Sequence, residues 1–299
     1  MVVAPSLAPF PAPQIWQWRG LPIAYQQWGT CGPAVVCVHG FGASWGHWRK
    51  NLPVLGQTFR CYALDLIGFG ASAKPRPGEP LDYTFATWAT LVADFCREVI
   101  GEPVFLVGNS IGCVVSMQTA VSFPSQVRGI AALNCSLRLL HDRKRQQLPW
   151  YRQIGASFLQ GLLTQEAIGR FFFQQIAQPQ TVRNILLQAY RNPEAVTDEL
   201  VELLLAPARD PGAAAVFLAF TRYSQGPLPE DLLPELSCPV LFIWGEADPW
   251  EAIALGRELA TYPCVEAFIP LPGVGHCPQD EAPDLVNPIL VRWITEKLG

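Results

Sequence analysis

The chain has 299 residues and a net charge of −4; half of its residues are hydrophobic and only 15% are charged. The negative charge gives no electrostatic basis for binding nucleic acid, and no apolar run reaches the roughly 18 residues that a transmembrane helix needs. The length is sufficient for one large domain, or for a core with an inserted lid.

Residues 1–13 contain four prolines and no basic segment followed by an apolar one. This composition fits neither a signal peptide nor a transit peptide, so we expect a flexible tail on a cytoplasmic protein.

The next segments, 14–19 and 23–28, flank a Gly-Leu-Pro turn and predict an antiparallel hairpin. Short β-branched runs then alternate with amphipathic stretches, which is typical of βαβ units and a parallel sheet. Strands are predicted at residues 34–39, 61–65, 104–108, 127–134, 240–244 and 265–271, and helices at about 86–100, 110–123, 251–261 and 283–297. The pattern predicts an α/β fold with a mostly parallel, eight-stranded sheet.

This alternation stops between residues 136 and 236, where no strand is predicted. Helices are predicted there at around 150–163, 165–177, 180–190, 197–205 and 211–224. We therefore expect a core made of residues 14–135 and 237–299, with an all-helical lid inserted between these two parts.

The sequence Gly108-Asn-Ser110-Ile-Gly112 follows one predicted strand and precedes a predicted helix. A G-x-S-x-G pattern at such a junction is typical of a nucleophile elbow, in which the serine hydroxyl projects above the sheet. Larger side chains two residues to either side would collide, and the helix N-terminus favours negative charge nearby. Ser110 is therefore the candidate nucleophile.

A serine hydroxyl needs a base, and the chain contains four histidines. His276 lies in a glycine-rich segment after the last predicted strand, from which its imidazole can reach back to Ser110. His39 ends a strand and is predicted to form structural hydrogen bonds, while His47 and His141 are predicted to be structural or solvated. His276 is the candidate general base.

The acid that orients the base should lie between the serine and the histidine in the chain. Asp248 follows the strand at 240–244, at the carboxyl end where catalytic groups collect, and Glu246 is the competing candidate. For the oxyanion, the backbone N–H of Ile111 is one predicted donor. The second is predicted at Phe41, with Gly42 as the neighbouring alternative.

Nine cysteines are scattered through apolar stretches, without a C-x-x-C pair or a Cys/His cluster at zinc spacing. This distribution predicts buried, reduced thiols in a cytosolic protein, and neither a metal site nor a cofactor.

These motifs together resemble the α/β-hydrolase superfamily: HGFG at residues 39–42, DLIGFGAS at 65–72, GNSIG at 108–112, GEAD at 245–248 and GH at 275–276. The longer segments at 39–49, 62–75 and 273–280 resemble a cyanobacterial and plastid branch related to pheophytinases and chlorophyll dephytylases. That resemblance implies cleavage of the phytyl ester of chlorophyll-type pigments, and peripheral contact with a thylakoid membrane as an alternative to a purely cytoplasmic location.

The predicted lid has apolar helical stripes, which either pack on the core or cover a lipophilic substrate. Their members are Trp150, Phe158, Leu159, Leu162, Leu163, Phe171, Phe172, Phe173 and Ile176. A basic cluster precedes them, formed by Arg138, Arg143, Lys144 and Arg145. It is either a solvated face or a surface that settles on an anionic membrane.

The sequence thus predicts a serine esterase that acts on a bulky lipophilic ester through an acyl-enzyme on Ser110. Two alternatives stay open: hydrolysis of a C–C bond by the same triad, and a non-catalytic ligand receptor with a hydrolase fold. Dehalogenase and epoxide hydrolase activities are disfavoured, because both call for aspartate at the position of Ser110.

Overall fold

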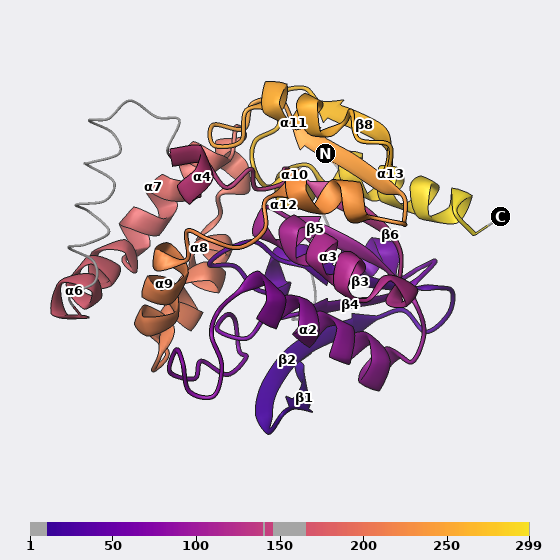
Figure 1. The fold of residues 1–299 in the computed structure, drawn as a ribbon. Helices are drawn as coiled ribbons and strands as arrows, with labels where there is room; N and C mark the ends of the chain where they lie inside the picture. Colours follow the sequence, from indigo (N-terminus) through magenta and orange to yellow (C-terminus); the bar gives the residue numbers. More distant parts are fainter. Residues whose placement is uncertain (1–10, 140, 146–165, 299) are drawn as a thin grey trace.

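The computed structural model describes residues 11–139, 141–145 and 166–298 (Figure 1). These residues form an eight-stranded sheet in the order β1-β2-β4-β3-β5-β6-β7-β8. The two pairings of β2 are antiparallel and the other five are parallel, which confirms the predicted fold. The strands are β1 (Gln14–Trp18), β2 (Leu21–Trp28), β3 (Ala34–Val38), β4 (Arg60–Leu64), β5 (Val104–Asn109), β6 (Val127–Leu133), β7 (Val240–Gly245) and β8 (Val265–Leu271).

The predicted hairpin is present, but its turn differs from the expected Gly-Leu-Pro segment. Leu21 and Pro22 already belong to β2, where they pair with Trp18 and Gln17. The turn is the two-residue segment Arg19-Gly20, with φ of 51° and 78°. Two positive φ angles match the twist of the flanking strands, and glycine adopts the second of them without strain.

Helices cover both faces of the sheet. The helices of the sheet domain are η1 (Trp45–Trp48), α1 (Leu52–Leu55), α2 (Phe85–Phe95), η2 (Cys96–Ile100), α3 (Ile111–Ser122), η3 (Pro124–Gln126), α11 (Ile253–Leu259), α12 (Pro278–Glu281) and α13 (Pro283–Glu296). The short α1 and α12 and the 3-10 turns were not predicted, because one helical turn is too short to show a 3.6-residue period.

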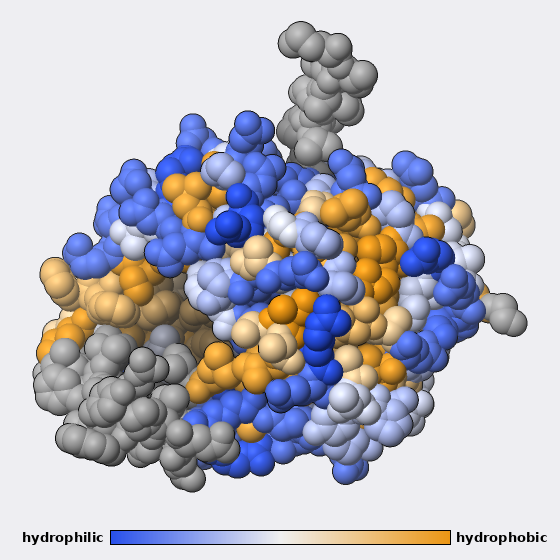
Figure 2. Space-filling model, turned by 90° about the horizontal axis from the view of Figure 1, so that it is seen from above, coloured by the Kyte–Doolittle hydropathy of each residue, from blue (hydrophilic) through white to orange (hydrophobic). Residues whose placement is uncertain are grey.

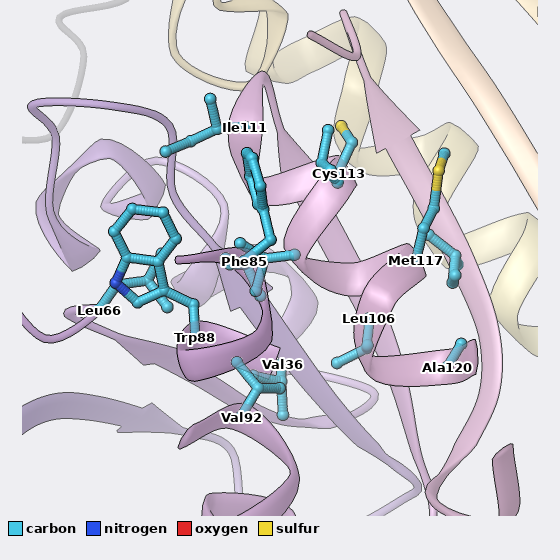
Figure 3. Packing of buried hydrophobic residues seen from close by; sticks show 14 of the residues in the cluster. Val36, Leu66, Phe85, Trp88, Val92, Leu106, Ile111, Cys113, Met117 and Ala120 are labelled. Atoms are coloured by element: carbon cyan, nitrogen blue, oxygen red, sulfur yellow. The ribbon is translucent and has the colours of Figure 1, made fainter. Parts of the chain in front are cut away.

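The central strands β3, β5 and β7 are buried on both faces. Val104 and Leu106 of β5 pack in the core on the side of α2 and α3, whereas Phe105 and Val107 pack in the second core, on the side of α1 and α13. Successive strand residues point to opposite faces, so a strand covered on both sides is apolar throughout. Figure 3 shows the first core, with Leu106 among the side chains of α2 and α3.

A helical insertion lies between β6 and β7, on one side of the sheet domain (Figure 1). Its described helices are α4 (Asp142–Arg145), α6 (Glu166–Ile176), α7 (Pro179–Ala189), η4 (Pro193–Ala195), α8 (Asp198–Leu205), η5 (Ala206–Arg209), α9 (Ala213–Arg222), α10 (Pro229–Leu232) and η6 (Leu233–Glu235). They include the helices predicted at 165–177, 180–190, 197–205 and 211–224.

Some predictions fall outside the described residues: most of the N-terminal tail, the helix at 150–163, and the apolar residues Trp150, Phe158, Leu159, Leu162 and Leu163. Within the described ranges, no single helix has the length and hydropathy to cross a membrane. One pair bent by 93°, Asp198–Arg209 with Ala213–Arg222, meets the criterion by length and composition alone.

Candidate active site

Ser110 lies on the sharp turn between β5 and α3, with φ of 55° and ψ of −121°. This conformation is sparsely populated for a residue with a side chain, and it is held by tight packing of the flanking glycines. A Cβ on Gly108 would lie 2.6 Å from the backbone of Gly112 and Cys113, and one on Gly112 would lie 2.2 Å from the carbonyl of Val38. The two glycines of the motif are therefore required by close backbone contacts.

His276 and Asp248 form a buried hydrogen-bonded pair. His276 Nδ1 lies 2.7 Å from Asp248 Oδ2, so Nδ1–H donates to the carboxylate and Nε2 is left as the proton acceptor. The side-chain amide of Asn109, the residue before Ser110, donates to the carbonyl oxygen of His276 over 3.1 Å. This bond holds the histidine loop beside the elbow.

The carboxylate of Asp248 accepts three further hydrogen bonds. Its Oδ1 accepts from the backbone N–H of Trp250 and Glu251, at 2.9 and 3.1 Å, and its Oδ2 accepts from the amide of Asn134 at 2.7 Å. Burial acts to raise the pKa of Asp248, but the bond to His276 and these donors outweigh it and lower the pKa below its ordinary value. Asp248 is thus a buried anion that fixes the imidazole.

The competing acid points elsewhere. The Glu246 side chain is 39% exposed and lies 4.0 Å from the guanidinium of Arg257. Of the two carboxylates proposed from the sequence, the structure brings Asp248 to His276.

The predicted oxyanion donors flank Ser110. Ile111 is the first residue of α3, where backbone N–H groups have no intrahelical acceptor. Gly40 packs against the nucleophile so closely that a Cβ there would lie 3.2 Å from Ser110 Cβ, which puts Phe41 next to the elbow. The ring of Phe41 stacks on Phe220 of α9 at 4.5 Å, so the insertion supports this loop.

A cavity of about 530 Å³ opens beside these donors. Figure 2 shows a hollow bordered by hydrophobic residues on this side of the molecule. The cavity is lined by Phe41, Ile111, Ser136, Arg138, Leu139, His141, Phe220, Thr221, Tyr223, Ser224, Trp250 and Glu251. A smaller cleft of about 60 Å³ shares Phe41 with it and continues between Phe69, Phe173 and Phe217. Apolar space therefore extends to both sides of Phe41.

Comparison with known proteins gives the family. The model of the alpha/beta hydrolase family matches residues 35–289. The chain belongs to this family.

Among curated relatives, the chloroplastic pheophytinase of Arabidopsis thaliana is 27% identical over 295 residues, which cover 88% of this chain and 61% of that protein. The uncharacterized hydrolase YugF of Bacillus subtilis is 26% identical, with 92% and 95% covered. A solved meta-cleavage product hydrolase of Pseudomonas fluorescens superimposes with a TM-score of 0.72 at 19% identity, with 95% and 98% covered. The chain thus spans about three-fifths of the length of the pheophytinase it matches.

The other histidines of this hydrolase are structural. His39 accepts the N–H of Leu66 at Nε2 and contacts the Gly40 carbonyl through Nδ1, while burial lowers its pKa to about 4. His47 is buried rather than solvated, and burial lowers its pKa to about 4 as well. His141 is also buried, with Nε2 3.0 Å from the Gly226 carbonyl.

Two residues of the site were missed by the sequence analysis, Asn134 and Glu251. Asn134 follows β6, and its position at the carboxyl end of a strand was the available signal. Its amide also accepts the N–H of Gly245, so it joins β6 to the Asp248 loop. Glu251 lies in the cavity wall; burial chiefly, and the charge of Asp248 in addition, raise its pKa to about 7.

The predicted basic cluster is engaged in contacts within the protein. Arg138 is buried and donates to the carbonyls of Tyr223, Gln225 and Pro227. Arg143 pairs with Asp231, and Lys144 lies 2.9 Å from Glu230. The side chain of Arg145 is outside the described set. For Arg138, a solvated face is therefore the wrong interpretation. Peripheral membrane contact stays a prediction.

Proposed function

We propose that the chain is a serine hydrolase that cleaves the carboxylic ester of a bulky, apolar substrate through an acyl-enzyme on Ser110. The supporting observation is the buried Asp248–His276 pair, fastened beside a strained serine elbow. His276 Nε2 takes the proton of Ser110 as the hydroxyl attacks the ester carbonyl, and Asp248 stabilises the resulting imidazolium.

The tetrahedral oxyanion then accepts hydrogen bonds from the backbone N–H groups of Ile111 and Phe41. As this intermediate collapses, His276 gives its proton to the leaving alkoxide, which departs as the alcohol. Water then attacks the acyl-enzyme by the same route, and the carboxylic acid is released with Ser110 restored.

The substrate class is inferred from the apolar space. A long hydrocarbon alcohol gains about 0.8 kcal/mol for each buried methylene, and the cavity with its adjoining cleft offers aromatic walls on both sides of Phe41. The similarity to pheophytinase supports the phytyl ester of a chlorophyll-type pigment as a specific substrate. The chain spans about three-fifths of that relative's length. The phytyl ester is therefore proposed as one specific case within the wider class of bulky, apolar esters.

Two measurements test the proposal. A fluorophosphonate should label the wild type but not Ser110→Ala, and ester turnover should fall by several orders of magnitude in the variant, since triad members act as a unit. Purified enzyme in detergent should also release phytol from pheophytin a or chlorophyll a, detected by mass spectrometry.

Labelling that persists in Ser110→Ala would contradict the nucleophile. Labelling without turnover of any ester would favour the receptor alternative. If the enzyme hydrolyses acetate or butyrate esters but releases no more phytol than Ser110→Ala does, the phytyl ester is refuted as a substrate. The assignment as a serine esterase would still hold.

A further inference from the structure

The loop of His276 is bonded directly to the helical insertion. The backbone N–H of His276 donates to the carbonyl of Ala189, the last residue of α7, over 2.8 Å. Gly275 packs so closely against the same carbonyl that a Cβ there would approach it to 2.1 Å. The insertion therefore provides part of the support of the general base.

One carboxylate spans the boundary between the two parts of the fold. Glu281 Oε2 accepts the N–H of Gly275 at 2.8 Å, on the side of the histidine loop. Its Oε1 accepts the N–H groups of Arg191 and Asn192 at 2.8 and 2.7 Å, just beyond α7. Three backbone donors from two separate segments thus converge on one side chain.

The residues around this carboxylate strengthen the same connection. Cys277, which follows His276, packs in the insertion's own hydrophobic cluster with Leu186, Ala189 and Tyr190 of α7 and its C-terminus. The hydroxyl of Tyr190 donates to Asp280 over 2.9 Å. Asp280 is fully buried and pairs with Arg49 of the sheet domain at 2.7 Å. The end of α7 therefore contacts both the histidine loop and α12.

We propose that Glu281 is a positioning residue that fastens the end of α7 to the His276 loop, so that the base occupies its working position only while the insertion is docked. This inference rests on the proposed function. The insertion would then act on catalysis as well as on substrate binding, because a displacement of α7 removes the acceptor of the His276 N–H.

Glu281→Gln tests the proposal with little change of shape. A glutamine presents one acceptor oxygen and one NH₂ group, so an N–H of the junction would face another N–H. Misplacement of a catalytic group by about 1 Å can cost on the order of 100-fold in rate. We expect kcat for a short ester to fall about 10- to 100-fold, with KM changed less than about threefold. Glu296→Gln, at an exposed position near the end of α13, is the matched control.

Amide hydrogen exchange gives a readout that does not depend on turnover. In Glu281→Gln the amides of Gly275 and His276 should exchange faster, together with those of Arg191 and Asn192. Gly275→Ala keeps every charge but places a methyl group against the Ala189 carbonyl. It should therefore also lower kcat and speed the exchange of the same amides.

Unchanged kcat and unchanged exchange in both variants would overturn the proposal. Faster exchange with normal kcat would also overturn it, because the junction would then hold the fold without positioning the base. A wild type that neither hydrolyses esters nor labels at Ser110 would refute the proposed function instead, while the exchange experiment would still test the junction.

Discussion

Replacing Glu251 by glutamine should change how the stability of this hydrolase depends on pH. Glu251 is 8% exposed, and its Oε2 accepts the N–H of Leu137 at 3.1 Å. Burial raises its pKa from 4.5 to about 7, against the opposing effects of that bond and of His276. In the unfolded chain the same carboxyl should titrate near its ordinary value.

The sign and the size follow from this difference. Between pH 4.5 and about 7 the folded protein holds a proton that the unfolded chain has released, so the free energy of unfolding falls as the pH rises through this window. A shift of about 2.5 pKa units at 1.36 kcal/mol per unit corresponds to about 3 kcal/mol. This contribution is intact below the unfolded pKa and lost above the folded one.

Urea unfolding at about pH 4.5 and about pH 8.5 would measure this effect. The quantity to follow is the free energy of unfolding of Glu251→Gln minus that of the wild type. Burial also raises the pKa of Asp65 to about 7, and the subtraction cancels its contribution because Asp65 titrates in both proteins. This difference should grow by about 3 kcal/mol toward alkaline pH. Glu246→Gln, at the exposed carboxylate, should show no such growth. A flat difference for Glu251→Gln would refute the reasoning.

Three further changes test the site and the cavity. Asp248→Asn should lower kcat/KM on the order of 10³-fold and Glu246→Gln less than about tenfold; equal losses would contradict the choice of acid. Asn134→Ala should lower kcat/KM by about 10- to 100-fold, because a hydrogen bond to a charged group is worth about 1.5–3 kcal/mol. Steady-state kinetics at constant pH would show an unchanged rate if Asn134 only joins strands. Phe220→Asp should reduce kcat/KM for long-chain esters more than for acetate esters. Phe171→Asp, at a side chain that is 64% exposed, should leave the ratio of these two kcat/KM values unchanged. An equal loss on both esters in Phe220→Asp would mean general destabilisation.

Local patterns were sufficient for the framework. The central strands and the longer helices were predictable because a strand buried on both faces is short and apolar, and a surface helix repeats every 3.6 residues. The elbow at Ser110 was also visible, since its G-x-S-x-G pattern lies between a predicted strand and a predicted helix, and the contact that requires Gly108 is with the backbone of Gly112 and Cys113 in the same turn. His276 and Asp248 followed from their positions after β8 and β7.

Only the tertiary structure decided which side chains meet across the sheet. Asn134 reaches Asp248 because β6 and β7 are neighbours, although the two residues are 114 positions apart. The same holds for the burial of Glu251 and His47 and for the three carbonyls that accept hydrogen bonds from Arg138. These contacts come from distant segments, which no sequence pattern connects. The junction of Glu281 with the end of α7 is of the same kind. Periodicity reports the face on which a residue lies, but the partner on that face is fixed by strand order and by the docking of the insertion.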